Sequence, residues 1–313
     1  MNILITGGAG FIGSRLAIRL VNEEHNVTVI DKLDGYYSKV RKQQQLDEVK
    51  KTGSFHFYPY DLLNEEECRK IFRASSFDCV VHLAGLPGVT NSIENPHIYI
   101  DEDIKATVNV LRLCGEAKVN HVVFASSSSV YGEQHGYPLS EEMASGKVVS
   151  PYSAAKFGAE SFCHVYQQIY GFQLAILRFF TVYGPSARPD MAIPIFIKRL
   201  LEDESIDVFG KNTARDYTYI DDIVDGIRSV IDQPRPNEIY NLGSGNPISM
   251  GQLLALLKDS FPKMRINQKA TRTGDVTSTW ANITKARNEL GFQPQVSIQE
   301  GLRRTIKWAR TNA

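Results

Sequence analysis

The chain has 313 residues, of which 42% are hydrophobic and 22% are charged, which is ordinary for a globular protein with one compound core or two domains. The 35 acidic and 35 basic side chains cancel, and without a basic run we expect no nucleic acid as a partner. We also expect no membrane association, because no apolar run approaches ~18 residues and the first strand-like run begins at residue 2, leaving no room for a signal peptide.

Strand-like apolar runs alternate with amphipathic helical patterns through the first half of the chain. The strands are expected at 2–6, 27–31, 55–59, 78–83 and 121–125, and the helices at 11–23, 65–73 and 96–117. A helix from Pro151 to Tyr170 and a sixth strand at 173–179 continue the series. Such alternation predicts an α/β fold with a parallel, doubly wound (Rossmann) sheet covered by helices on both faces.

The first strand runs directly into a glycine-rich turn that opens a helix. Gly7, Gly10 and Gly13 are spaced so that a pyrophosphate can approach the backbone at the positive end of the helix dipole. The second strand ends in Asp31, at the distance expected for a carboxylate that binds a ribose. Together these features predict a dinucleotide site, against the alternative of an ordinary turn, and Asp31 favours NAD over NADP unless Lys32 offsets its charge.

Small and polar side chains follow the next strands at the edge where ligands bind in open α/β sheets. Leu83-Ala84-Gly85 ends the fourth strand, and the fifth runs into Ser126 to Ser129. Asp61, after the third strand, fits either a contact to the adenine amino group or a helix cap.

From Thr181 onward, prolines at 185, 189 and 194 interrupt a less regular mixture of helices and short strands. We therefore expect two domains. Residues 1–180 would form the NAD-binding domain and residues 181–313 a smaller α/β substrate domain, with segments that can cross back to the first.

Tyr152 and Lys156 lie four residues apart on a predicted helix and so share one face of it. A free phenol loses its proton only near pH ~10. A cation about 4 Å away, at an effective dielectric of ~20, favours the phenolate by ~4 kcal/mol. With Ser127 from the neighbouring strand end, this set predicts a general base for removing the proton of an alcohol while hydride leaves its carbon. Alone, the Tyr-Lys spacing also fits an ordinary helix surface.

The four cysteines are scattered along the chain and form no C-x-x-C pair: Cys68, Cys79, Cys114 and Cys163. This pattern indicates a reducing, cytoplasmic compartment and no metal site.

The motifs together resemble the extended short-chain dehydrogenases/reductases, in the group of NAD-dependent sugar-nucleotide epimerases and dehydratases, over essentially the whole chain. The matching stretches are Gly7-x-x-Gly10-x-x-Gly13, Asp31, Leu83-Ala84-Gly85, 127–132, Tyr152-x-x-x-Lys156, 178–185, 215–222 and 272–275.

The resemblance implies roles for individual residues. Catalysis would fall to Ser127, Tyr152 and Lys156. The cofactor would be NAD, bound by Gly7, Gly10, Phe11, Ile12, Gly13, Asp31, Lys32, Asp61, Leu62, Leu83, Ala84, Gly85, Tyr152, Lys156 and Phe179. A UDP-sugar would be bound by Pro87, Ser127, Ser128, Ser129, Thr181, Arg188, Arg215, Arg272 and Asp275. Arg215 and Arg272 would hold its diphosphate and Asp275 its ribose, although an ion pair and a turn are the simpler alternatives for Arg215 and Asp275. The helices at 96–117 and 152–170 would pair across a homodimer.

Within this family the chain is most similar to UDP-glucuronate 4-epimerases. Arg188 fits a sugar carboxylate because guanidinium binds carboxylate in a bidentate manner, although a solvated loop charge is the alternative. Ser128 and Ser129 stand where related dehydratases and decarboxylases carry acids, which disfavours both of those reactions. Thr90 replaces a usual arginine and Asp103 a usual asparagine, which leaves another UDP-sugar open.

We therefore expect an enzyme that inverts C4 of UDP-glucuronate through a 4-keto intermediate. The alternatives are a UDP-glucose or UDP-N-acetylglucosamine 4-epimerase, another NAD-dependent dehydratase, decarboxylase or reductase of sugar nucleotides, and a regulator that binds NAD without turnover. The intact set of Ser127, Tyr152 and Lys156 argues against the regulator.

Overall fold

The computed structural model describes residues 1–36, 38–210 and 213–312, and its main sheet has seven parallel strands within those ranges. The strands are β1 (Asn2–Thr6), β2 (Asn26–Ile30), β3 (His56–Tyr58), β4 (Cys79–His82), β5 (His121–Ser127), β6 (Gln173–Phe179) and β11 (Glu238–Leu242). Their order in the sheet is β11-β6-β5-β4-β1-β2-β3. The chain adds β2 and β3 on one side of β1 and then crosses to add β4 and the later strands on the other side, so the order of addition reverses between β1 and β4. The predicted doubly wound parallel sheet is confirmed, and its crevice opens at this reversal.

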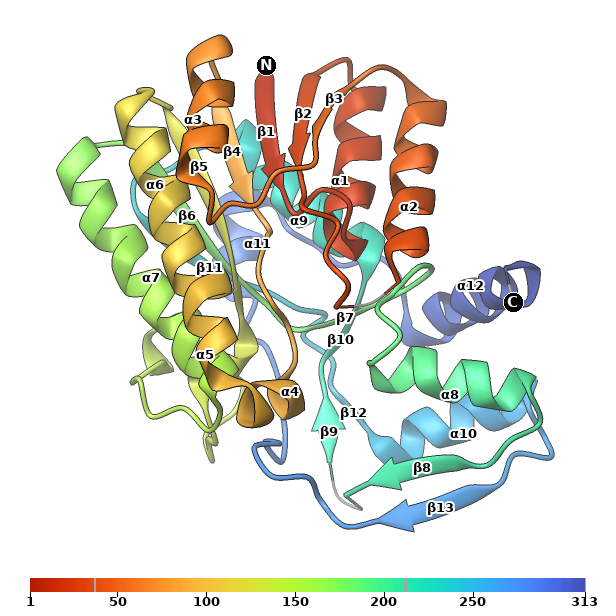
Figure 1. Cartoon of the computed structure of the whole chain (residues 1–313). Coiled ribbons are helices and arrows are strands. Elements are labelled where there is room, and N and C mark those ends of the chain that lie inside the picture. Colours follow the sequence, from red (N-terminus) through yellow and green to blue (C-terminus); the bar gives the residue numbers. More distant parts are fainter. Residues whose placement is uncertain (37, 211–212, 313) are drawn as a thin grey trace.

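Helices cover both faces of the sheet (Figure 1). On one face lie α1 (Phe11–Asn22), α2 (Lys39–Thr52) and α9 (Ile220–Asp232), and on the other α3 (Glu65–Ala74), α6 (Ala106–Glu116) and α7 (Pro151–Tyr170). Side chains alternate between the faces, since Ile3 and Ile5 pack with Leu16 of α1 while Leu4 packs with Ile71 of α3. Apolar residues at every strand position are therefore buried, which explains why these strands read as continuous apolar runs.

The segment predicted as one helix over 96–117 is divided into three. It consists of α5 (Pro96–Tyr99), a π-helical stretch η1 (Ile100–Lys105) and α6. π-turns inside helices are rare and frequently lie at functional sites. Here η1 packs against α7 and carries the buried Asp103.

The C-terminal part of the chain forms a smaller lobe, at the lower right of Figure 1. It contains α8 (Ala192–Leu201), α10 (Met250–Ser260) and the parallel pair β8 (Ile206–Phe209) and β13 (Ile266–Lys269). Shorter elements are α4 (Val89–Glu94), η2 (Ser128–Tyr131), η3 (Glu141–Met143), β7 (Thr181–Tyr183), β9 (Ala214–Arg215), β10 (Tyr217–Tyr219), β12 (Ile248–Ser249), α11 (Thr284–Leu290) and α12 (Ile298–Thr311).

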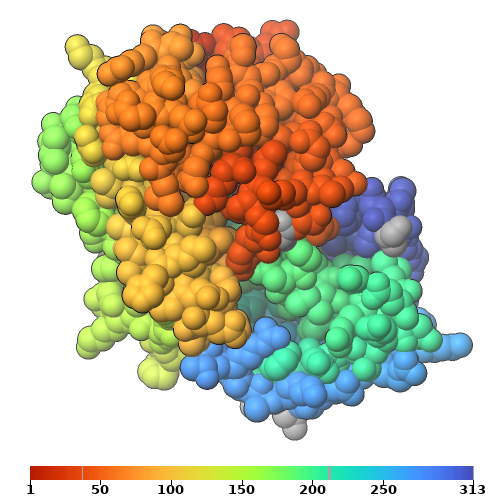
Figure 2. Space-filling view, viewed as in Figure 1, coloured from red at the N-terminus to blue at the C-terminus, as the bar shows by residue number. Residues whose placement is uncertain are grey.

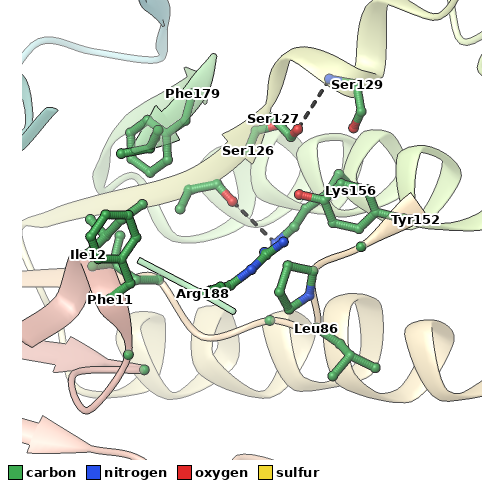
Figure 3. A pocket seen from close by; sticks show the side chains of 18 of the residues that line it. Phe11, Ile12, Leu86, Ser126, Ser127, Ser129, Tyr152, Lys156, Phe179 and Arg188 are labelled. Carbon is green, nitrogen blue, oxygen red and sulfur yellow. Dashed lines mark hydrogen bonds between the residues drawn. The ribbon is translucent and has the colours of Figure 1, made fainter. Parts of the chain in front are cut away.

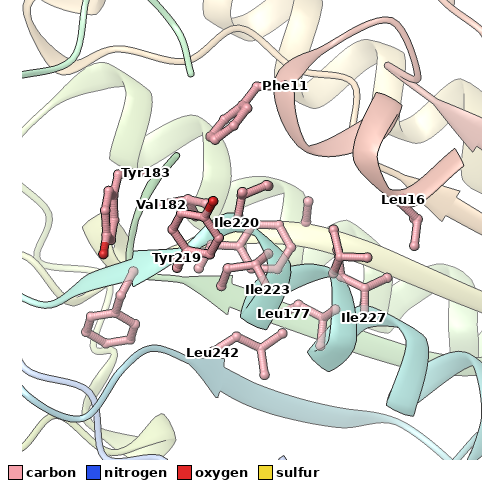
Figure 4. Close-up of a cluster of buried hydrophobic side chains, with 14 of the residues drawn as sticks. Phe11, Leu16, Leu177, Val182, Tyr183, Tyr219, Ile220, Ile223, Ile227 and Leu242 are labelled. Atoms are coloured by element: carbon pink, nitrogen blue, oxygen red, sulfur yellow. The ribbon is translucent and has the colours of Figure 1, made fainter. Parts of the chain in front are cut away.

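The chain crosses back from the smaller lobe to the large sheet. β11 adds to the sheet beside β6, and Ile223 and Ile227 of α9 pack in one cluster with Leu16 and Leu177 (Figure 4). The domain division at residue 180 stays a prediction, with α9 and β11 as crossing segments. In the described ranges, no helix is both long and apolar enough to cross a bilayer.

Candidate active site

A cavity of about 420 Å³ lies at the carboxyl ends of the sheet strands, where the two lobes meet. Figure 2 shows the seam between the large lobe, coloured red to yellow with light green at its left edge, and the smaller lobe below it, coloured green to blue. The cavity lies within the ~300–1,000 Å³ that is usual for ligand pockets. Of the predicted residues, its lining includes Gly7, Gly10, Phe11, Ile12, Gly13, Asp31, Lys32, Leu62, Leu83, Ala84, Gly85, Pro87, Ser127, Ser128, Ser129, Tyr152, Lys156, Phe179, Thr181, Arg188, Arg215 and Asp275.

The glycine turn after β1 has no room for side chains. Gly7 has φ +70°, and a Cβ there would lie 2.7 Å from the backbone nitrogen of Ala84, while a Cβ on Gly13 would lie 2.4 Å from the carbonyl oxygen of Gly7. In the described part of the chain, no side chain caps the N-terminus of α1 at Gly10. The helix start is therefore open to an anion such as a pyrophosphate.

Asp31 lies buried at the end of β2 and is held by its surroundings. Its carboxylate accepts from the backbone N–H of Ala9 (3.1 Å) and of Leu33 (2.9 Å) and pairs with Lys42 on α2 (3.3 Å). Lys32 instead pairs with Asp61 and Glu102. The cation beside Asp31 is thus Lys42, which we did not predict because the local sequence gives no sign of how α2 is placed.

Ser127, Tyr152 and Lys156 meet at the other end of the cavity, away from Phe11 and Ile12 (Figure 3). Ser127 ends β5, and its Oγ accepts from the N–H of Ser129 (3.2 Å). Tyr152 and Lys156 come from the first turns of α7, which begins at Pro151. The hydroxyl of Ser150, the residue before it, caps the helix by accepting from a backbone N–H.

Lys156 is buried and surrounded by groups that stabilise its charge. Its Nζ lies 3.2 Å from Oδ1 of Asp103 and 3.4 Å from the carbonyl oxygen of Ala125, and 5.4 Å from the ring centre of Phe124. Burial acts to lower the pKa of Lys156, but Asp103 and Tyr152 oppose it, and the pKa is raised overall. Lys156 therefore stays cationic at neutral pH.

A second buried ion pair holds α7 against the sheet. Glu160, one turn after Lys156, accepts from Arg178 of β6 at 3.0 and 2.7 Å and from the hydroxyl of Ser126. Arg178 also donates to the hydroxyl of Tyr131. The arginine that opens the 178–185 motif thus fixes the helix that carries Tyr152 and Lys156.

Two arginines that were predicted to bind the substrate line the cavity. Arg215 donates to the carbonyl oxygens of Ala214 (2.9 Å) and Thr277 (3.2 Å). Arg188 forms a paired contact with the carboxylate of Asp190, Nε to Oδ1 at 3.1 Å and Nη2 to Oδ2 at 3.2 Å. Asp190 therefore already places a carboxylate against the guanidinium that was predicted to bind one.

Several residues singled out in the sequence do not line the cavity. Asp61 lines a shallow hollow next to it, and Arg272 lies over the ring of Phe209, with Cζ 3.7 Å from the ring centre. Their proposed roles stay predictions. Thr90 is exposed on α4, whereas Asp103 is fully buried.

A glycine cradle at the start of a helix, a buried carboxylate at the end of β2 and a Tyr-Lys pair along one crevice fit a nicotinamide dinucleotide. The fold and this site define a Rossmann enzyme of the short-chain dehydrogenase/reductase type.

Comparison with known proteins gives the family. The model of the NAD dependent epimerase/dehydratase family matches residues 3–243, and the chain belongs to that family.

Relatives match over nearly the full length of the chain. A UDP-glucuronate 4-epimerase from Thermodesulfobacterium geofontis is 42% identical over 99% of this chain and 96% of its own. The crystal structure of UDP-glucuronic acid 4-epimerase from Bacillus cereus, in complex with UDP-glucuronic acid and NAD, is 34% identical, with TM-score 0.93 and full coverage of both chains. A UDP-glucose 4-epimerase from Thermotoga maritima, with UDP-glucose, is 32% identical, with TM-score 0.91 over 100% of this chain and 99% of its own.

Proposed function

We propose that this chain is an NAD-dependent epimerase that inverts C4 of UDP-glucuronate to give UDP-galacturonate through a transient 4-keto sugar. The observation that carries the proposal is that one cavity is lined both by Ser127, Tyr152 and Lys156 and by Arg188 with Ser128 and Ser129. The first group can oxidise and reduce an alcohol, and the second can bind a carboxylate. The 42% identical relative is a UDP-glucuronate 4-epimerase.

The protein's part in the reaction follows from the placement of these groups. Tyr152 takes the proton of the C4 hydroxyl, and Lys156 supports the phenolate by its charge. Ser127 lies beside them and donates to the same oxygen. Bound NAD accepts the hydride from C4 and returns it to the opposite face. Between the two transfers the sugar must turn, while its diphosphate stays bound by Arg215 on the smaller lobe.

A 4-keto glucuronate is a β-keto acid that can lose carbon dioxide, so the site must hold the carboxylate out of line with the carbonyl. Arg188, Ser128 and Thr181 line the cavity, and the Ser129 hydroxyl is buried with no hydrogen-bond partner among the described residues. Because buried hydroxyls are normally paired, we propose that the Ser129 side chain turns toward a bound carboxylate and donates to it. Neither serine can act as the carboxyl acid or base that elimination requires.

A second candidate, UDP-glucose 4-epimerase, is favoured by what stands at positions 188 and 90, where a cation for the sugar carboxylate was expected. Arg188 is already engaged by Asp190, and Thr90 supplies no cation. A neutral hexose would leave the Arg188–Asp190 pair in place.

The two candidates are separated by their products. The purified enzyme is offered UDP-glucuronate, UDP-glucose and UDP-N-acetylglucosamine separately without added cofactor, and the sugars are followed by proton NMR. Conversion of UDP-glucuronate at the highest kcat/KM supports the proposal. Rapid conversion of UDP-glucose with none of UDP-glucuronate overturns it in favour of the second candidate.

We further propose that the enzyme is a homodimer. One face of α7 exposes Phe162, Val165 and Ile169, which recur at the helical spacing of three and four residues, and the exposed Tyr170 follows Ile169. Ile169 is 62% exposed, and such an apolar stripe is typical of a helix that packs against a partner. Light scattering should give a dimer mass, and Val165→Asp together with Ile169→Asp should give a monomer.

We propose that the protein is cytoplasmic, because its cysteine thiols are not joined in disulfides. Cys68, Cys79, Cys114 and Cys163 are all free and buried. Free thiols are typical of proteins from a reducing compartment. Fractionation of the source cells tests this.

A further inference from the structure

Asp103 is a buried carboxylate that has no assigned part in binding the substrate or the cofactor. It lies on η1 and is 0% exposed. Its Oδ1 pairs with Nζ of Lys156 at 3.2 Å and accepts from the N–H of Leu86 at 3.0 Å. Its Oδ2 is buried with no hydrogen-bond partner among the described residues. A carboxylate at this depth is ionised only because Lys156 compensates it.

Lys156 lines the cavity, and Asp103 is buried directly behind it. Gly85, at the exit of β4, is in contact with both partners, since a Cβ there would lie 2.3 Å from Oδ1 of Asp103 and 2.7 Å from Nζ of Lys156. The exposed backbone at Gly85 lets the charged pair approach the crevice. A change in the charge of Asp103 therefore changes the electrostatic potential at Lys156, which lines the cavity together with Tyr152.

The titratable groups that face Lys156 come from three elements. They are Asp103 of η1, Tyr152 and Cys163 of α7, and His82 of β4, while Glu102 and Tyr99 face Asp103. Burial lowers the pKa of His82 to about 3 and raises that of Cys163, so both are neutral near pH 7. Burial also raises the pKa of the Asp103 carboxyl, and Lys156 opposes that rise. Because the ion pair with Lys156 keeps this carboxyl ionised, Asp103 is the negatively charged group that faces Lys156 among the described residues.

We propose that Asp103 is a positioning residue that holds Lys156 in the site and screens part of its charge from Tyr152, and so sets the pH range in which Tyr152 acts as base. This inference rests on the proposed epimerase function. The phenolate of Tyr152 is stabilised by the Lys156 cation, and a carboxylate 3.2 Å from that cation opposes the effect. An amide at position 103 could keep the contact to Leu86 without the charge.

The test compares Asp103→Asn with a matched control, Asp101→Asn, which removes one negative charge from the exposed side of the same turn. In Asp103→Asn, the midpoint of the rising limb of kcat/KM against pH should move down by roughly one pH unit. The rate below that midpoint should then rise about tenfold. The control should follow the wild-type profile. Asp103→Ser, which leaves room for a water beside Lys156, should shift the profile in the same direction.

A second readout does not depend on turnover. The positive nicotinamide favours the phenolate, so binding of NAD releases protons over a range of pH that calorimetry in buffers of different ionisation enthalpy can measure. This range should also move down in Asp103→Asn. Coincident midpoints in both measurements, even with a lower melting temperature, would show that Asp103 is only structural and would overturn the proposal. If no UDP-sugar is converted, the proposed function fails, and the proton release alone decides the role of Asp103.

Discussion

Removal of the Arg188 guanidinium tests whether it binds the sugar carboxylate. A charge-assisted, bidentate contact that is partly desolvated contributes about 1.5–3 kcal/mol. In the free enzyme, however, Arg188 is paired with Asp190, and its side chain is 22% exposed and that of Asp190 40%. A pair of this exposure is worth only about 0.5 kcal/mol, which the substrate must replace. The net loss in Arg188→Ala is then about 1–2.5 kcal/mol, or a fall in kcat/KM for UDP-glucuronate of about 5- to 70-fold.

Initial rates by NMR or a coupled assay should show this fall for UDP-glucuronate and less than about a threefold change for UDP-glucose, which has no carboxylate. Asp190→Asn provides the complementary variant, because it releases Arg188 and should lower KM for UDP-glucuronate. Arg303→Ala, on the exposed side of α12, is the control for loss of a surface cation. Equal losses on both sugars would refute the reasoning and assign Arg188 to the loop or the diphosphate.

Further outcomes follow from Tyr152, Asp31 and His82. Tyr152→Phe should lower turnover by about 10²–10⁴ while calorimetry shows nearly unchanged binding of NAD and UDP-sugar, and wild-type turnover would show that another group takes the proton. Enzyme stripped of cofactor should bind NAD more tightly than NADP because Asp31 repels a 2′-phosphate, and Lys42→Met should widen this preference; equal affinities in the wild type would contradict it. Burial lowers the pKa of His82 to about 3, below the unfolded value near ~6.5, so its contribution to stability is complete above pH ~6.5 and is lost as the pH falls toward 3. Urea unfolding should show a loss of roughly 2 kcal/mol between pH 6.5 and 5 that His82→Gln reduces, with a residual slope from His121, whose pKa burial lowers to about 4; an unchanged slope would exclude His82 as its source.

Two kinds of site feature could be predicted from the sequence. One kind depends on local spacing along the chain, and the other on the fact that ligands bind at the carboxyl ends of parallel strands. Gly7, Tyr152 and Lys156 fall within single turns of chain whose geometry the sequence dictates, and strand ends bring Asp31 and Ser127 to the same edge. The remaining features depend on tertiary packing.

The contacts that were not predicted join residues from distant or irregular segments. Lys42 reaches Asp31 only because of how α2 lies against α1, and Asp190 meets Arg188 through the shape of a loop. The π-turn that buries Asp103 is set by its packing against α7 and has no propensity signal of its own. β11 was missed because its short run lies in the irregular second half.

The position of β11 has a consequence for synthesis of the protein. Until residue 242 has left the ribosome, β6 is the last strand on its side of the sheet, and its Leu174 to Leu177 stretch is an open, apolar edge. About 60 residues separate the two strands, so at 5–20 residues per second the nascent chain carries this edge for roughly 3–12 seconds. During that interval another chain could pair with β6 in place of β11. Slower translation, or a mutation that weakens β11, should therefore increase aggregation of new chains while leaving the finished enzyme little changed.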